Sequence, residues 1–167
     1  DDFLVATQGT PEHKIVREKS HKLILMQAKY NQLRSCGGIR VQPYAIEIFG
    51  GSGVGKSTIG QVLMELVLRN NGYDYQPHRI VTLSECDQYD SNMKSHINGI
   101  YADDVAQMQA KYISRNPLER LLYYINNVRH KATMAEAELK GKVEVEPKCI
   151  VATTNVKDLN ATIYCNE

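Results

Sequence analysis

Apolar residues recur along the chain in two spacings, which predict alternating helices and strands. Helical spacing predicts helices over Lys14 to Ser35, Thr58 to Asn70 and Leu118 to Lys140. Short apolar or β-branched runs predict a buried strand over Tyr44 to Phe49 and further strands over Arg79 to Leu83, Ile97 to Ala102 and Cys149 to Thr153. This alternation favours an α/β fold, a mainly parallel sheet with helices on both faces and ligands at the carboxyl ends of the strands.

The first predicted helix has an apolar stripe. Thr10-Pro11-Glu12 supplies a cap and first turn, and Gly37-Gly38 ends the helix. The apolar stripe consists of Val16, Leu23, Met26, Tyr30 and Leu33. These spacings of seven, three and four residues predict an amphipathic helix whose first role is packing.

The same segment is strongly basic. Only Glu18 opposes the basic residues Lys14, Arg17, Lys19, Lys22, Lys29, Arg34 and Arg40. Such a run is usually a solvated helix face, which is the interpretation we favour from the charge pattern. The alternative is a surface that attracts a polyanion such as single-stranded RNA.

Composition narrows the class of protein without naming a partner. The 167 residues suffice for one compact domain, and the 43% hydrophobic content, 23% charged content and net charge of +1 are typical of soluble globular proteins. The four cysteines, Cys36, Cys86, Cys149 and Cys165, include no Cys-x-x-Cys pair and suggest neither a zinc site nor a disulfide framework.

No apolar stretch approaches the roughly 18 to 20 residues that span a bilayer, and the acidic start does not resemble a signal peptide. Any membrane anchor is therefore expected outside this chain. The chain begins without Met and stops soon after a predicted strand, so we expect a fragment of a longer protein.

The segment Gly50 to Ser57 matches the phosphate-loop pattern, a glycine, four residues and then Gly-Lys-Ser. It lies between a predicted strand and a predicted helix, which is the context the motif needs. Its glycines would let backbone N–H groups surround phosphates, Lys56 would approach the β and γ oxygens, and Ser57 would ligate Mg²⁺. The alternative is a glycine-rich turn with an exposed lysine. The nucleotide contacts predicted here are Gly50, Gly51, Ser52, Gly53, Val54, Gly55, Lys56, Ser57 and Thr58.

An acidic pair, Asp103-Asp104, follows a short apolar run. Asp103 would hold Mg²⁺, directly or through water, and Asp104 would orient or deprotonate the attacking water. The alternative is a surface turn, and Asp87 and Asp90 compete for the same role without following an apolar run.

A third polar residue, Asn155, ends the last predicted strand. Its amide can hydrogen-bond a γ-phosphate or the water that attacks it. Asn after a strand is otherwise merely a turn former.

In their order along the chain, these motifs resemble motifs A, B and C of the superfamily 3 helicases, within the AAA+ class. The three are Gly50 to Ser57, Asp103-Asp104, and Ala152 to Asn155. The stretches Tyr44 to Gly50, Tyr101 to Gln107 and Met134 to Gly141 further resemble the non-structural helicase-ATPase of picorna-like positive-strand RNA viruses, with a dicistrovirus-like or iflavirus-like placement. The resemblance covers Pro43 to Ala161.

The resemblance implies a P-loop NTPase core with five parallel strands, residues 43–167, truncated at its C-terminal end and preceded by a helical lead-in, residues 1–42. It implies ATP and Mg²⁺ as cofactors, assembly of the full-length protein into a hexameric ring, and single-stranded RNA and other viral replication proteins as partners. It places the full-length protein in the host cytoplasm at membrane-associated replication complexes. Lys140 is the position expected to contact nucleic acid, and the alternative for Lys140-Gly141 is an ordinary helix end.

Three features of the family are missing from this sequence. Family members carry arginine fingers after motif C, yet no arginine follows Arg129. The family's membrane-binding segment and its C-terminal cysteine-rich region are also missing. Because loss of an arginine finger costs on the order of a thousandfold in rate, weak hydrolysis is expected of the isolated chain.

The main hypothesis is the ATP-hydrolysing core of a viral RNA helicase. A P-loop kinase would share the loop but usually needs a lid rich in arginine, whereas Arg115, Arg120 and Arg129 are scattered. A third possibility is a non-catalytic, nucleotide-gated scaffold of a replication complex.

Overall fold

The computed structural model of the chain describes residues 11–35, 39–107 and 115–164. Contacts divide the chain into two compact units, Asp1–Gly37 and Gly38–Glu167. The boundary predicted between residues 42 and 43 stays a prediction. Within the described residues, no helix is both long and apolar enough to cross a bilayer.

The first unit contains one long helix, α2 (Pro11–Ser35). It confirms the predicted helix and starts at a proline, a residue favoured in the first helical turn. Three residues of the predicted stripe, Leu23, Met26 and Tyr30, are at least 60% exposed, so α2 does not bury them within its own unit. The cap expected at Thr10 and the end expected at Gly37-Gly38 lie outside the described residues.

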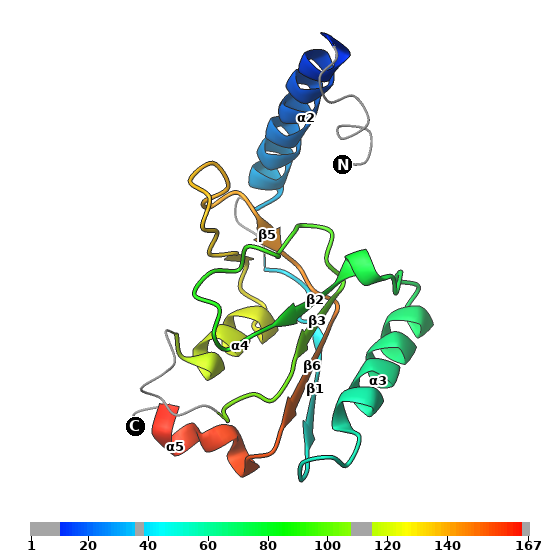
Figure 1. Cartoon of the computed structure of the whole chain (residues 1–167), viewed down its shortest axis with the longest axis vertical. Coiled ribbons are helices and arrows are strands. Elements are labelled where there is room, and N and C mark those ends of the chain that lie inside the picture. Colours follow the sequence, from blue (N-terminus) through cyan, green and yellow to red (C-terminus); the bar gives the residue numbers. More distant parts are fainter. Residues whose placement is uncertain (1–10, 36–38, 108–114, 165–167) are drawn as a thin grey trace. The chain divides into compact units, whose positions relative to one another are not determined.

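The second unit is built on a parallel sheet (Figure 1). Its strands are β1 (Tyr44–Phe49), β2 (Ile80–Leu83), β3 (Gly99–Ala102) and β6 (Cys149–Thr154). Their order is β1-β6-β3-β2, and every neighbouring pair is parallel. Each strand begins and ends within two residues of its predicted bounds. The described residues form four strands in this sheet, one fewer than the family resemblance implies.

Strand β1 was predicted to be buried, and that prediction is wrong. Tyr44 is 63% exposed and Phe49 is 56% exposed, because β1 lies at the edge of the sheet. Strands β3 and β6 lie in the interior of the sheet and are buried at every position.

Helices lie on both faces of the sheet, as the α/β prediction requires (Figure 1). Helix α3 (Lys56–Asn70) packs on one face through Met64 and Leu68, against Tyr101 and Val151. A Cβ atom at Gly60 would lie 3.0 Å from the Tyr101 ring, so this glycine lets α3 approach the sheet closely. Tyr101 is buried in this contact, and the burial raises the pKa of its phenol.

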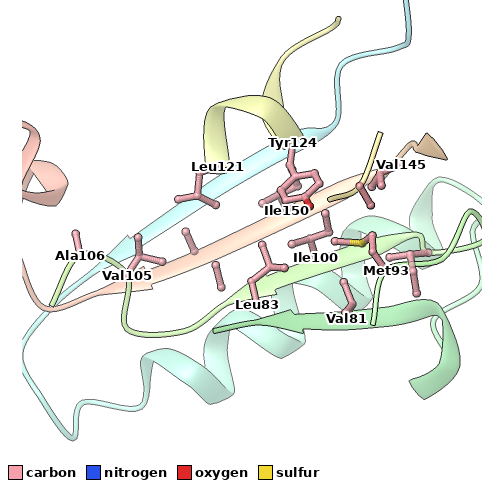
Figure 2. Close-up of a cluster of buried hydrophobic side chains, with 14 of the residues drawn as sticks. Val81, Leu83, Met93, Ile100, Val105, Ala106, Leu121, Tyr124, Val145 and Ile150 are labelled. Carbon is pink, nitrogen blue, oxygen red and sulfur yellow. The ribbon is translucent and has the colours of Figure 1, made fainter. Parts of the chain in front are cut away.

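Helix α4 (Pro117–Ile125) covers the other face. Figure 2 shows Leu121 and Tyr124 of α4 turned toward Ile150 and Ile100 of the sheet. The Asn116 side chain caps α4 by accepting hydrogen bonds from the N–H groups of Leu118 and Glu119. The two helix layers and the sheet between them confirm the predicted three-layer α/β core. The shorter elements are η1 (Pro77–Arg79), β4 (His130–Lys131), β5 (Glu144–Val145), η3 (Lys157–Asn160) and α5 (Ala161–Tyr164).

The helix predicted over Leu118 to Lys140 is wrong beyond Ile125, because the chain turns at Asn126 into the antiparallel pair β4 and β5. Arg40 stabilises the C-terminal end of α4. Its guanidinium donates hydrogen bonds to the carbonyl oxygens of Tyr123, Tyr124 and Asn126, at 2.6 to 2.8 Å, and to that of Val145 at 2.7 Å. These bonds satisfy carbonyls that a helix end leaves without partners. Arg40 is only 4% exposed, so it is not part of a solvated basic face or an RNA surface.

A second buried charge group, here called the Asp90 cluster, contains Asp90, Arg115 and Arg120. The Asp90 carboxylate lies 2.6 Å from Arg120 Nη2 and 3.2 Å from Arg115 Nη1, and it also accepts the Thr133 N–H at 3.1 Å. Burial raises the pKa of Asp90, but the charge of Arg120 and the hydrogen bonds that the carboxylate accepts together outweigh it and hold the pKa below its usual value. The cluster ties the segment after β2 to α4 and to the β4 region.

Candidate functional site

The predicted phosphate loop, Gly50 to Ser57, directly joins the carboxyl end of β1 to the start of α3. Gly53 and Gly55 adopt φ angles of 75° and 85°, a left-handed conformation that favours glycine. Helix α3 begins without a side-chain cap and without an acidic residue in its first turn. Its N–H groups and its positive dipole end are therefore available to an anion.

Lys56 points back into this loop. Its ammonium donates a hydrogen bond to the Gly51 carbonyl at 2.8 Å and another to Asn155 Oδ1. The residue is only 7% exposed, which does not fit the alternative of a turn with an exposed lysine. An ammonium has three protons to donate, so Lys56 retains a donor for a phosphate oxygen.

The structure brings the first acidic residue, Asp103, next to the loop. Ser57 Oγ donates to Asp103 Oδ1 at 3.2 Å, and Thr153 Oγ1 also donates to that carboxylate. Ser57 and Asp103 are both exposed. A hydroxyl and a carboxylate oxygen side by side are the donor types that Mg²⁺ takes.

A magnesium ion here would need more ligands than the protein offers. Among the described residues, no group of three or more His, Cys, Asp or Glu side chains could hold a metal. This fits Mg²⁺ chemistry, in which one or two protein ligands are usual and phosphate oxygens and waters complete the shell. Ser57 and Asp103 would hold such an ion, which would neutralise charge on the phosphates.

The competing acidic residues are placed elsewhere. Asp90 is 3% exposed and engaged by two arginines, so it is unable to take a metal or a water. Asp87 is exposed in the segment after β2, outside the contacts that join Ser57 and Asp103.

The turn after β3 holds Asp104 in an uncommon backbone conformation. Asp104 has a φ of 52° and Ala106 one of 62°. Three hydrogen bonds hold the turn. The Asp104 N–H donates to Thr153 Oγ1 at 3.1 Å, and the Val105 N–H donates to the Thr153 carbonyl at 2.8 Å. The Ala106 N–H donates to the Glu85 carboxylate. Strained positions of this kind persist only where surrounding contacts impose them, and they cluster at functional sites.

Two of these residues were not among the predicted site residues. Thr153 lies within β6, where its strand pattern concealed a polar role, although a threonine two residues before Asn155 is a signal. Glu85 lies two residues after β2, and its carboxylate supports the Asp103-Asp104 turn. No local pattern marks Glu85, since its partner is 21 residues away.

Asn155 connects the loop to the acidic pair through Gln107. Asn155 accepts from Lys56 and, through Nδ2, donates to Gln107 Oε1 at 2.9 Å. Gln107 Nε2 in turn donates to Asp104 Oδ1 at 2.6 Å. We call Lys56, Asn155, Gln107 and Asp104 the Lys56 network. Gln107 was missed as a site residue, although its position three residues after Asp104 was visible in the sequence.

The position nominated for nucleic acid, Lys140, lies apart from this site. It is exposed in the connection between β4 and β5, followed by Gly141 with a φ of 69°. The connection is not helical, so the alternative of an ordinary helix end is wrong. Lys131 and Lys142 on the same hairpin are exposed as well.

Comparison with known proteins agrees with this geometry. A model of the RNA helicase family matches residues 46–156, from within β1 to the residue after Asn155. The chain is also 27% identical over 165 residues to a genome polyprotein of Rice tungro spherical virus (strain A), covering 97% of this chain and 5% of the polyprotein. This chain thus spans only a small part of the curated relative it matches.

The family match includes all three sequence motifs and confirms the predicted resemblance to superfamily 3 helicases. The narrower placement beside dicistroviruses or iflaviruses stays a prediction. Since the matched residues make up more than half of the chain, this chain belongs to the RNA helicase family.

Proposed function

We propose that the chain is the ATP-binding and ATP-hydrolysing core of a viral RNA-replication helicase. The observation that carries the proposal is the meeting, at one edge of the sheet, of a buried lysine, an uncapped helix N-terminus and a hydroxyl–carboxylate pair. These features supply a phosphate cradle and a magnesium position together, which a glycine-rich turn alone would not.

In this proposal the residues of Gly50 to Thr58 surround the phosphates. Lys56 binds the β and γ oxygens, and Ser57 and Asp103 hold Mg²⁺. Asp104 orients or deprotonates the water, and Asn155 senses the γ-phosphate. The metal supplies charge neutralisation, while the protein supplies orientation.

The further partners are also proposals. They are single-stranded RNA, with Lys140 as a contact, copies of the same protein in a hexameric ring, and other viral replication proteins. The site of action would be the host-cell cytoplasm, with membrane contact through segments outside this chain. The family match supports RNA binding and self-association in general terms.

The kinase alternative would need an arginine-rich lid, and the three scattered arginines do not supply one. Arg115 and Arg120 pair with Asp90, and Arg129 lies 2.6 Å from Glu144 and 3.1 Å from Glu146. These arginines serve ion pairs of the fold and supply no lid over the phosphate loop.

The test compares ATP binding and phosphate release by the wild-type chain, Lys56→Ala and Lys94→Ala, each with and without single-stranded RNA. Lys94 is an exposed lysine outside the site, and its variant is the control. Lys56→Ala should weaken ATP binding about 100-fold, because charge-assisted bonds to phosphate are lost, whereas Lys94→Ala should match the wild type. Equal ATP affinity and equal turnover for Lys56→Ala would refute the proposed mechanism.

The same assay separates the alternatives. Stimulation of turnover by RNA supports the helicase proposal, and stimulation by a small-molecule phosphate acceptor instead supports a kinase. ATP binding without turnover, persisting when the flanking polyprotein sequence is present, supports a scaffold.

A further inference from the structure

The Lys56 network has a direction that its two ends determine. A lysine ammonium only donates hydrogen bonds, and an ionised aspartate only accepts them. Asn155 must therefore present Oδ1 to Lys56, which leaves Nδ2 for Gln107. Gln107 must accept with Oε1 and donate with Nε2 to Asp104. The assignment of both amides is the only one in which every contact pairs a donor with an acceptor.

Gln107 is the sole described side chain that bonds both Asn155 and Asp104. Asn155 follows β6 and Asp104 follows β3, two strands that are neighbours in the sheet. Gln107 lies at the end of the Asp103-Asp104 turn, where the backbone N–H of Ala106 is held by Glu85 and the carbonyl of Ala106 accepts from Asn160 Nδ2 at 2.9 Å. The segment that precedes Gln107 is therefore anchored on two sides.

In the structure, Lys56 donates to Gly51 and Asn155 and keeps a third donor. A phosphate oxygen at that third donor carries negative charge, whereas Asn155 Oδ1 is neutral, so the ammonium is attracted more strongly to the phosphate. Phosphate binding would therefore shift Lys56 toward the phosphate and weaken the hydrogen bond that Asn155 accepts. Any change in Asn155 reaches Gln107 through a 2.9 Å contact and Asp104 through a 2.6 Å contact.

We propose that Gln107 is a positioning residue that transmits phosphate occupancy at Lys56 to the Asp104 carboxylate by way of Asn155. This inference rests on the proposed ATPase function. The bonds from Lys56 through Asn155 and Gln107 hold Asp104 in one orientation. When phosphate shifts Lys56, the bond to Asn155 weakens and Gln107 turns Asp104 toward the water.

The test uses Gln107→Ala, Gln107→Glu and, as a matched control, Gln61→Ala. Gln61 is an exposed glutamine on α3 outside the Lys56 network. Gln107→Ala should leave the Kd for ATP within about threefold of wild type and lower kcat roughly 10- to 100-fold, the scale of a misplaced reacting group. Gln107→Glu keeps the length but faces Asp104 with a carboxylate, so its kcat should fall at least as far. A wild-type kcat in either Gln107 variant would overturn the inference.

A double variant distinguishes transmission from a local packing effect. If Gln107 acts only through Asn155, adding Gln107→Ala to Asn155→Ala should lower kcat no further, because residues of one network are not additive. A kcat that falls by the product of the two single effects would contradict the relay.

Hydrogen exchange provides a readout that does not need turnover. ATP should change amide exchange in residues 103–107 of the wild type and of Gln61→Ala, but not of Gln107→Ala. The same response in Gln107→Ala, or no response in an ATP-bound wild type, would overturn the relay. If the wild-type chain does not bind ATP at all, the proposed function fails instead, so the two failures are distinguishable.

Discussion

The Asp90 cluster and the Lys56 network both join acidic and basic side chains from distant parts of the second unit. They differ in burial and in unused bonding capacity. Asp90 is 3% exposed and its carboxylate accepts from Arg115, Arg120 and a backbone N–H. Asp103 and Asp104 are exposed, and Lys56 makes only two of its three possible bonds. A buried, satisfied cluster serves the fold, whereas an open one is able to accept a ligand.

The comparison also shows that acidic residues near the glycine-rich loop Gly50 to Ser57 are not interchangeable. Asp90 and Asp103 follow neighbouring strands, β2 and β3, and both lie within reach of polar partners. Only Asp103 contacts the loop, through Ser57. Variants of the two groups should separate the role of Asp90 in stability from that of Asp103 at the loop, and the largest effect is expected in the Asp90 cluster.

Removing the main partner of Asp90 should produce the largest effect. Arg120→Met leaves a buried carboxylate with weaker compensation, so the free energy of unfolding should fall by about 3 to 5 kcal/mol. Urea unfolding followed by circular dichroism measures this change. The control is Arg69→Met, whose ion pair with Glu65 is exposed and should contribute at most about 1 kcal/mol. Similar losses in the two variants would remove the distinction between buried and exposed pairs.

Changing Asp103 should affect the metal and spare the fold. Asp103→Asn removes a charged oxygen ligand, so the gain in ATP affinity on adding Mg²⁺ should fall roughly 10-fold while ATP affinity without metal changes little. Titrations of ATP with and without Mg²⁺ measure the difference. Asp87→Asn, an exposed aspartate outside the Ser57 contact, should keep the full magnesium effect. An unchanged magnesium effect in Asp103→Asn would remove Asp103 from the proposed metal site.

Lowering the pH should reduce the contribution of the Asp90 cluster to the free energy of unfolding. The pKa of Asp90 is lower in the folded state than its ordinary value of 3.8, so its stabilising contribution is fully present above that value. The contribution is lost as the pH falls through the lower, folded-state pKa. Urea midpoints measured from pH 6 downward should drop more steeply for the wild type than for Asp90→Asn. Parallel slopes would contradict a depressed pKa for Asp90.

The smallest effect is expected at the hairpin. Lys140→Ala removes one exposed charge, so stability should change by less than about 0.5 kcal/mol. RNA affinity should fall a few-fold, and the salt dependence of binding should lessen by about one counterion. Fluorescence anisotropy at several salt concentrations measures both quantities. An unchanged affinity and salt slope would exclude Lys140 as a phosphate contact.

Much of the fold could be predicted from local patterns. The strand, loop and helix around Gly50 to Ser57 were identified because apolar runs, glycines and helical spacing are contiguous in the sequence. The helix beyond Ile125 could not be excluded in this way, since α4 ends where Arg40, 83 to 86 residues away, binds its last carbonyls. The exposure of β1 likewise depends on its edge position, which no local spacing encodes.

For the site, the chemistry of each candidate was visible in the sequence but its partners were not. Asn155 and Gln107 are 48 residues apart in the sequence. The order of β1, β6 and β3 in the sheet brings Asn155 Nδ2 to 2.9 Å from Gln107 Oε1. The roles of Glu85 and Thr153 follow from the turn after β3, whose backbone N–H groups donate hydrogen bonds to both side chains.

The sequence by itself identified the glycine-rich loop, the acidic pair, Asn155 and the alternation of helices and strands, because glycine conformation, side-chain chemistry and residue spacing are local properties. Only the tertiary structure decided which charges are buried in the fold, where β1 lies, and which glutamine joins Asn155 to Asp104. Those outcomes depend on strand order and long-range packing, which bring together residues that no local pattern connects.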